Sequence, residues 1–178
     1  AISAEAHKRA MRATRPGRRE YEIEAELLHE FRRGGSEYPA YTSIVAGGAN
    51  ACVLHYVANN AELRDGDLLL IDAGCEFAGY ASDITRTFPV NGRFSGPQRE
   101  LYELVLAAQA SAVAATRPGA PYNAPHEAAV RVLAQGMLDL GLLSGSLDAA
   151  IEQGVKREGG CFRFYMHRTG HWLGMDVP

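Results

Sequence analysis

Residues 67–90 read DLLLIDAGCEFAGYASDITRTFPV and predict an antiparallel β-hairpin. The first part is apolar, the last part is rich in β-branched and aromatic residues, and the middle contains the glycine and alanine residues at which the chain would turn. With the turn centred near Phe77 and Ala78, Asp72 would lie opposite Asp83. Directly opposed carboxylates destabilise an antiparallel pair by roughly 0.2–1 kcal/mol. Because a bound cation would remove this penalty, the hairpin is a candidate metal site.

Helical patterns flank this strand region on both sides. Apolar residues recur at helical spacing before it, as in Ile23, Leu27 and Phe31, and again after it. We expect helices at 3–13, within 21–35, from 96 onward, at 124–140 and within 144–160, and further strands at 42–48, 49–56 and 161–168. Helices before and after one group of strands predict a single α+β domain.

Composition narrows the function classes. The 178 residues, 47% of them hydrophobic, suffice for one ordinary domain or a piece of a larger one. The net charge of −3, with both signs interleaved, gives no reason to expect a nucleic-acid partner. No apolar stretch approaches the roughly 20 residues that cross a bilayer, so we expect no membrane association.

The cysteines and the N-terminal residues indicate a compartment. Cys52, Cys75 and Cys161 are odd in number and widely spaced, which is not the pattern of a disulfide framework. The first residues are charged throughout and lack the apolar core of a secretory signal. We therefore expect a reducing, cytoplasmic setting.

A second group of candidate residues lies near the C-terminus, where HRTGH places His167 and His171 four residues apart. That spacing puts both on one face of a strand or of a helix. Arg168 stands where the HExxH zinc-peptidase motif carries its glutamate, which excludes that motif. Two aspartates and an imidazole form an oxygen-rich site that suits Mn²⁺, Co²⁺ or Zn²⁺. A bridging carboxylate could hold two ions roughly 3.5–4 Å apart around a shared water.

Each candidate also has a purely structural interpretation. An aspartate at the end of a strand often caps a turn, although the pair together is more specific than either alone. His55 in CVLHY and His126 near a helix start have the pattern of buried core histidines. His7 and His29 have the pattern of surface helix residues.

Three strings resemble the catalytic domain of the Xaa-Pro aminopeptidases (aminopeptidase P), a family of pita-bread metallopeptidases: residues 38–56, 64–94 and 164–177. IDAG, SDITRTFPV and HxxxHWLG carry the resemblance by their order and spacing, and it covers essentially the whole chain. It implies an α+β pita-bread fold with 1–178 as a partial catalytic domain. It also implies two divalent ions, most often Mn²⁺, peptide substrates with proline in second position, and a homo-oligomeric full-length protein.

The resemblance extends to individual residues. Asp72 matches a metal-ligating aspartate, Asp83 matches the aspartate that bridges both ions, and His171 matches the single histidine ligand. His55 and His167 match active-site histidines that position substrate and stabilise developing negative charge. Pro178 stands where the family usually has a further substrate-binding histidine.

Two departures from the family concern length. The family's remaining ligands are two glutamates on strands beyond HWLG, and its N-terminal domain precedes the region matched here. We therefore expect a truncated catalytic domain that is inactive as a peptidase by itself. A prolidase, which takes only dipeptides, and a pita-bread module that binds without catalysis are the alternatives.

Overall fold

The computed structural model describes residues 1–177. Within this range the chain forms two compact units. The first comprises Ala1–Ser95 together with the segment that begins at Trp172, and the second comprises Gly96–His171.

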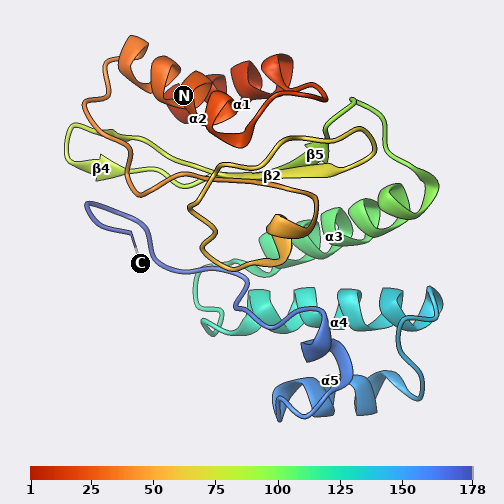
Figure 1. Ribbon diagram of the computed structural model, residues 1–178. Coiled ribbons are helices and arrows are strands. Elements are labelled where there is room, and N and C mark those ends of the chain that lie inside the picture. Colours follow the sequence, from red (N-terminus) through yellow and green to blue (C-terminus); the bar gives the residue numbers. More distant parts are fainter. Residues whose placement is uncertain (178) are drawn as a thin grey trace. The chain divides into compact units, whose positions relative to one another are not determined.

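Two helices cover one face of the sheet in the first unit (Figure 1). Helix α1 spans Ile2–Ala13 and buries Ser3, Ala6, His7 and Ala10, which the helical period places on one side. Helix α2 spans Glu20–Arg33 and buries Glu20, Ile23, Leu27 and Phe31 in the same way. Acidic residues in the first turn of α2 and arginines in its last turn complement the helix dipole.

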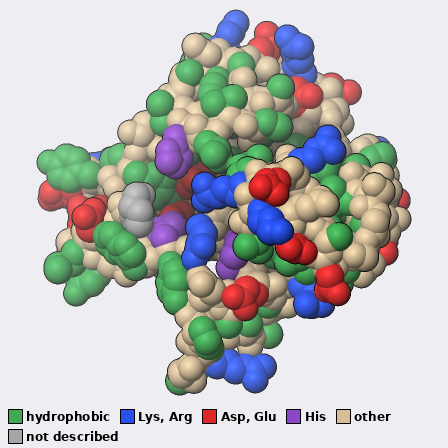
Figure 2. Space-filling view, turned by 90° about the horizontal axis from the view of Figure 1, so that it is seen from below, with side chains coloured by type: hydrophobic (Ala, Val, Ile, Leu, Met, Phe, Trp, Pro, Cys, Tyr) green, Lys and Arg blue, Asp and Glu red, His purple; other side chains and the backbone are tan. Residues whose placement is uncertain are grey.

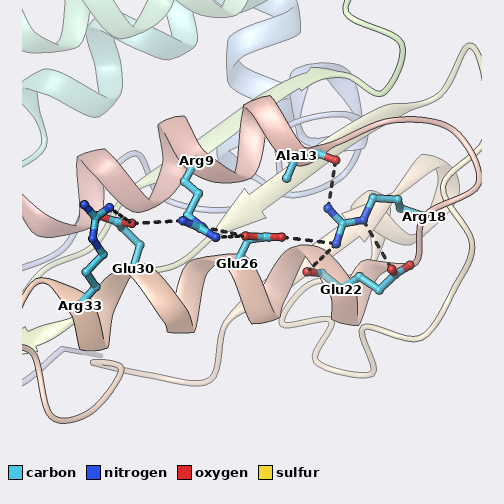
Figure 3. A network of polar contacts seen from close by, with 7 residues as sticks. All are labelled: Arg9, Ala13, Arg18, Glu22, Glu26, Glu30 and Arg33. Carbon is cyan, nitrogen blue, oxygen red and sulfur yellow. Dashed lines mark hydrogen bonds and ion pairs between the residues drawn. The ribbon is translucent and has the colours of Figure 1, made fainter.

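Ion pairs join α1 to α2 along their partly exposed side (Figure 3). The Arg9 guanidinium contacts Glu26 at 2.7 Å and Glu30 at 3.7 Å. The Arg18 guanidinium, in the connection between the two helices, contacts Glu22 and Glu26 of α2, each at 3.5 Å. Pairs of this exposure contribute roughly 0–1 kcal/mol each, less than the burial of one leucine or phenylalanine. The apolar faces therefore contribute more than the ion pairs to the packing of the two helices.

The sheet of the first unit is antiparallel, with strand order β1-β2-β5. Strand β1 spans Ile44–Gly47, β2 spans Leu68–Asp72 and β5 spans Thr85–Pro89. Val45, Leu69 and Ile71 are fully buried and pack with the apolar residues of α1 and α2 in one core. Leu69 and Ile71 of this core belong to β2, the strand that ends in Asp72.

A narrow ribbon extends the β2–β5 hairpin beyond Asp72. It contains β3 (Glu76–Phe77) and β4 (Tyr80–Ala81), which pair with each other. Ala78 and Gly79 form the turn, with φ values of 53° and 83°. Two central residues with positive φ are the turn geometry that matches the right-handed twist of a hairpin. The predicted hairpin is confirmed.

Helices make up the second unit. They are α3 (Gly96–Ala115), α4 (Ala124–Asp139) and α5 (Leu147–Val155), followed by the short 3₁₀ helix η2 (Gly160–Arg163). Their shared core contains mainly small residues, among them Ala108, Ala112 and Ala134, together with Leu133 and Met137. The side chain of Ser146 accepts a hydrogen bond from the Ala149 amide and caps α5.

Two of the predicted strands are wrong. Residues 49–56 form the 3₁₀ helix η1 (Gly48–Cys52) and a turn, because the Asn59 side chain occupies the edge of β1 that a further strand would need. Residues 161–168 begin in η2, where Cys161 is buried in the helical core. Residues 162–167 (FRFYMH), although apolar and polar side chains alternate among them, therefore do not pair with any strand in the described residues. The five expected helices are all present.

Within residues 1–177, none of the helices combines the length and the hydropathy that a membrane crossing requires.

Candidate metal centre

Two predicted ligands, Asp72 and Asp83, converge on one tyrosine hydroxyl. Asp72 is the last residue of β2, and Asp83 lies in the break between β4 and β5. The Tyr41 hydroxyl lies 2.6 Å from Oδ1 of Asp72 and 2.9 Å from Oδ1 of Asp83. The two carboxylates therefore lie on the same face of the hairpin.

The predicted register of this hairpin is wrong by one position at the turn. The turn lies at Ala78 and Gly79, and the residue opposite Asp72 is Thr85. Hydrogen bonds from Ser82 N to Cys75 O (3.0 Å) and from Ala73 N to Ile84 O (3.1 Å) continue this alignment through the break. Moving the turn by one residue changes the residue opposite Asp72 from Asp83 to Thr85, two positions along the strand. Side chains two positions apart lie on the same face, so Asp83 remains on the face of Asp72. Asp72 and Asp83 are thus diagonal neighbours.

Gly74 makes this close arrangement possible. The alignment of the two chain segments places Gly74 opposite Asp83, and a Cβ atom at Gly74 would overlap the carbonyl oxygen of Ser82. The Gly74 carbonyl accepts a hydrogen bond from the Ala40 amide at 2.9 Å. Glu76 N donates to Tyr38 O at 3.0 Å. These bonds attach the segment that carries Tyr41 to the hairpin, so Tyr41 is positioned by backbone pairing.

Burial raises the pKa of the Asp72 carboxyl, and the hydrogen bond from Tyr41 offsets part of this effect while the charge of Asp83 adds to it. The pKa of Tyr41 is raised by burial and by the hydrogen bonds and charges of both aspartates. A phenol has one proton and can donate it to one carboxylate at a time. The arrangement concentrates negative charge in a half-buried site, which suits a cation.

His7 supports the back of the hairpin, and the prediction that it is a surface residue is wrong. It is 3% exposed, and its Nε2 lies 3.0 Å from the carbonyl oxygen of Ala73, the residue after Asp72. Ser3, on the same face of α1, contacts Ser82 Oγ at 2.7 Å and accepts a hydrogen bond from Cys75 N. The helical spacing of Ser3, His7 and Ala10 was the signal that could have placed His7 inside.

His55 lies in the loop between β1 and β2 and is exposed, so its interpretation as a core histidine is wrong. Histidine side chains are visible on the surface in Figure 2. The backbone of His55 has φ 55°, in the left-handed region that residues other than glycine rarely adopt. Tyr56, which follows it, donates a hydrogen bond to the buried carboxylate of Glu20 at 2.7 Å.

The second unit holds the HRTGH segment against the start of α4. Thr169 Oγ1 lies 2.9 Å from Nδ1 of His126 and 2.7 Å from the Tyr165 hydroxyl. The Arg168 guanidinium donates to the side chain of Asn123. His126, which sequence patterns assigned to the core, instead contacts this segment from a half-buried position.

The remaining candidates are exposed or undescribed. His167 is exposed and its Nδ1 lies 3.0 Å from the carbonyl oxygen of Arg168, while His171 is the last residue of the second unit. In the part of the chain that the structure describes, the aspartate pair is not joined by a third histidine, cysteine or acidic side chain in one cluster. Pro178, which stands where the family usually has a substrate-binding histidine, lies outside the described range.

Comparison with known protein families and sequences identifies the family of this chain. The sequence profile of metallopeptidase family M24 matches residues 1–178. The chain belongs to metallopeptidase family M24. The M24 chain is 57% identical to the Xaa-Pro aminopeptidase of Haemophilus influenzae over 99% of its own length and 40% of that protein. The Xaa-Pro dipeptidase of Mus musculus is 39% identical over 99% of this chain and 36% of its own length.

Solved structures of M24 relatives share the fold. The aminopeptidase PepP of Pseudomonas aeruginosa superimposes with a TM-score of 0.95 and 57% identity, covering 99% of this chain and 39% of that one. Zinc-substituted aminopeptidase P of Escherichia coli, in complex with product, gives a TM-score of 0.94 and 49% identity with the same coverage. The predicted α+β pita-bread class is confirmed for the region that this M24 chain represents, which is about two fifths of those relatives.

Proposed function

We propose that the full-length protein containing this chain is a metal-dependent aminopeptidase that releases the N-terminal residue from peptides with proline in second position. The observation that supports this proposal most directly is the convergence of Asp72 and Asp83 around the Tyr41 hydroxyl. It occurs in an M24 chain that is 57% identical to an Xaa-Pro aminopeptidase. Because the chain spans about 40% of that relative, the activity belongs to the whole protein.

In this proposal Asp72, Asp83 and His171 would hold two divalent ions. Carboxylate and imidazole donors suit Mn²⁺, Co²⁺ and Zn²⁺, and we expect Mn²⁺. The zinc-substituted relative from Escherichia coli agrees with a divalent ion of this class. When bound, the ions supply an activated water and polarise the scissile carbonyl.

The other residues act on substrate and geometry. His55 and His167 donate hydrogen bonds to the oxygen that gains negative charge as the carbonyl is attacked. Tyr41 holds the two carboxylates at a fixed separation, since its hydroxyl is within hydrogen-bonding distance of both. His7, from α1, fixes the backbone beside Asp72 through the Ala73 carbonyl.

The 178-residue chain alone is expected to lack peptidase activity. Asp72 and Asp83 supply two negative charges, whereas two divalent ions carry four positive charges, so further acidic ligands are needed to neutralise the site. We place residues 1–178 within one catalytic domain, in a homo-oligomer. A cytoplasmic location agrees with the three cysteines, which are all unpaired.

The test uses the full-length protein, stripped of metal with a chelator and then supplied with Mn²⁺. The substrates are a tripeptide with proline in second position, the same tripeptide with alanine there, and an Xaa-Pro dipeptide. The proposal expects the N-terminal residue to be released from the proline tripeptide only when metal is present. Cleavage of the dipeptide alone would identify a prolidase, the function suggested by the mouse relative. Metal binding without cleavage of any substrate would identify a non-catalytic module.

A further inference from the structure

A buried glutamate outside the aspartate pair joins both ends of the loop that carries His55. Glu20, the first residue of α2, is 0% exposed. Its Oε1 accepts hydrogen bonds from the Gly47 amide at 2.8 Å and from the Asn50 side chain at 3.0 Å. Its Oε2 accepts from the Tyr56 hydroxyl at 2.7 Å and from the Ala61 amide at 2.9 Å.

These four donors lie on both sides of His55 in the chain. Gly47, the last residue of β1, and Asn50 precede it, and Tyr56 and Ala61 follow it, so a single carboxylate joins the two sides of loop 48–61. Asn59 adds a second attachment, because its side chain accepts from Val45 N at 2.9 Å and donates to Ser43 O at 2.8 Å. The loop is therefore held at its base by buried polar side chains.

The tip of the loop has few such restraints. Val53, Leu54 and Val57 are 56%, 63% and 53% exposed, and His55 lies among them. The left-handed backbone of His55 is a strained conformation for a residue with a side chain, and it persists only when its surroundings determine it. The hydrogen bond from the next residue, Tyr56, to Glu20 is the nearest such restraint.

A carboxylate is suited to this task in a way that an amide is not. It accepts at both oxygens, so it can satisfy four donors at once. Burying a charge is unfavourable unless hydrogen bonds compensate, which ties the burial of Glu20 to one loop conformation. In Glu20→Gln, one amide NH₂ would face two donors and force the loop to rearrange.

We infer that Glu20 is a positioning residue that sets the conformation of loop 48–61 and thereby the place of the His55 imidazole. The inference rests on the proposed function, because it assigns His55 a part in the reaction. Glu20 itself is enclosed and does not contact substrate. Its effect on turnover passes through His55.

The first test is a double-mutant cycle in the full-length protein, with kcat and KM measured for Glu20→Gln, His55→Ala and the double variant. Glu20→Gln is expected to lower kcat by about 10–100-fold, the range for a misplaced catalytic group. The double variant is expected to be no slower than His55→Ala alone. Multiplication of the two single effects would show that Glu20 acts by some other route, and would overturn the inference.

Glu26→Gln is the matched control, since it makes the same change on the same helix and removes the ion pairs of Glu26 with Arg9 and Arg18. It is expected to lower the Tm without changing kcat. If Glu20→Gln does not fold, Tyr56→Phe replaces it in the cycle. This change removes one donor to Glu20 and keeps the aromatic side chain. A kcat equally reduced in Glu26→Gln would also overturn the inference.

The second test does not depend on activity. Chymotrypsin cleaves after Leu54, which is exposed, or after Tyr56, which is half-buried, only if the loop opens. Limited proteolysis followed by mass spectrometry therefore reports the loop conformation. Glu20→Gln is expected to be cut at these sites at least about 10-fold faster than wild type, and Glu26→Gln at the wild-type rate. Unchanged cleavage in Glu20→Gln would overturn the inference. A wild-type protein that cleaves no proline peptide would instead refute the proposed function, and this test would still decide whether Glu20 holds the loop.

Discussion

Asp72 and Asp83 are diagonal neighbours on one face of the hairpin, and Oδ1 of each lies within hydrogen-bonding distance of the same Tyr41 hydroxyl. Strand pairing sets their separation, and Tyr41 is held beside them by the backbone bond from Ala40 to Gly74. The pair is consequently arranged by the fold before any ion binds.

Tyr41→Phe removes the shared hydroxyl and keeps the aromatic ring. Partners that orient metal ligands typically contribute 10–100-fold to metal affinity or activity. We therefore expect a loss of about 10–100-fold in Mn²⁺ affinity, measured by metal titration of the full-length protein. Tyr38→Phe is the control, because Tyr38 is 66% exposed and contacts the hairpin through its backbone. Equal affinities of the two variants would contradict the role of Tyr41.

Asp83→Asn removes a charge from the centre of the proposed site and keeps the side-chain size. We expect kcat/KM to fall by at least about 100-fold, more than for a residue that only orients a ligand. Glu103→Gln provides the comparison, since Glu103 forms an exposed pair with Arg99 on α3. If both variants retained the same activity in a peptide-release assay, Asp83 would not be a ligand.

His171 and His167 are expected to differ in role. In the full-length protein, His171→Ala should lower the bound metal content, measured by elemental analysis after dialysis. His167→Ala should retain the metal and lose turnover, because its imidazole acts on the substrate oxygen. A His167→Ala protein that has lost its metal would reverse this assignment.

Gly74→Ala tests the packing of the hairpin. The added methyl group would overlap the Ser82 carbonyl oxygen, which cannot move away without breaking strand pairing. We expect the free energy of unfolding to fall by about 1–3 kcal/mol or more, measured by urea denaturation. The control is Gly96→Ala, at a position where a Cβ meets no neighbour within 4 Å. Equal stability of the two variants would show that the hairpin accommodates a side chain at Gly74, and would contradict the packing role assigned to this glycine.

The buried side chain of His7 is expected to make the stability of the fold depend on pH. Burial lowers the pKa of His7, a change that the Ala73 carbonyl and the charge of Asp72 oppose and that Arg86 reinforces. The unfolded chain then binds a proton more readily than the folded chain, so stability is present above about pH 6.5 and is lost as pH falls toward the folded-state pKa. His7→Gln keeps a donor for Ala73 and cannot titrate. We expect its unfolding free energy to decline less between pH 7 and pH 5 than that of wild type.

The matched control for this pH series is His29→Gln, which replaces an exposed histidine on α2. Urea denaturation of the 178-residue chain at each pH, with chelator present, gives the two slopes. An equal flattening of the pH dependence in both variants would show that His7 is not the group responsible.

Local patterns in the sequence determined the helices, the β-hairpin and the orientation of the aspartate pair, but not the structure of residues 49–56 and 161–168. Apolar spacing placed α1 and α2 almost to the residue, because helical periodicity is a property of neighbouring positions. The alternation of side chains along a strand placed Asp72 and Asp83 on one face, and this result survived a wrong turn position because the register changed by two residues.

Only the tertiary structure revealed the groups that hold these residues in place. Tyr41 is 31 positions from Asp72, His7 is 66 positions from Ala73, and Glu20 is 41 positions from Ala61. The local sequence does not specify which distant polar group will form a hydrogen bond with which donor, because this depends on how the helices and the sheet pack. The interior excludes water, so a buried carboxylate or imidazole must find its partners within the folded chain, and packing alone decides which ones they are.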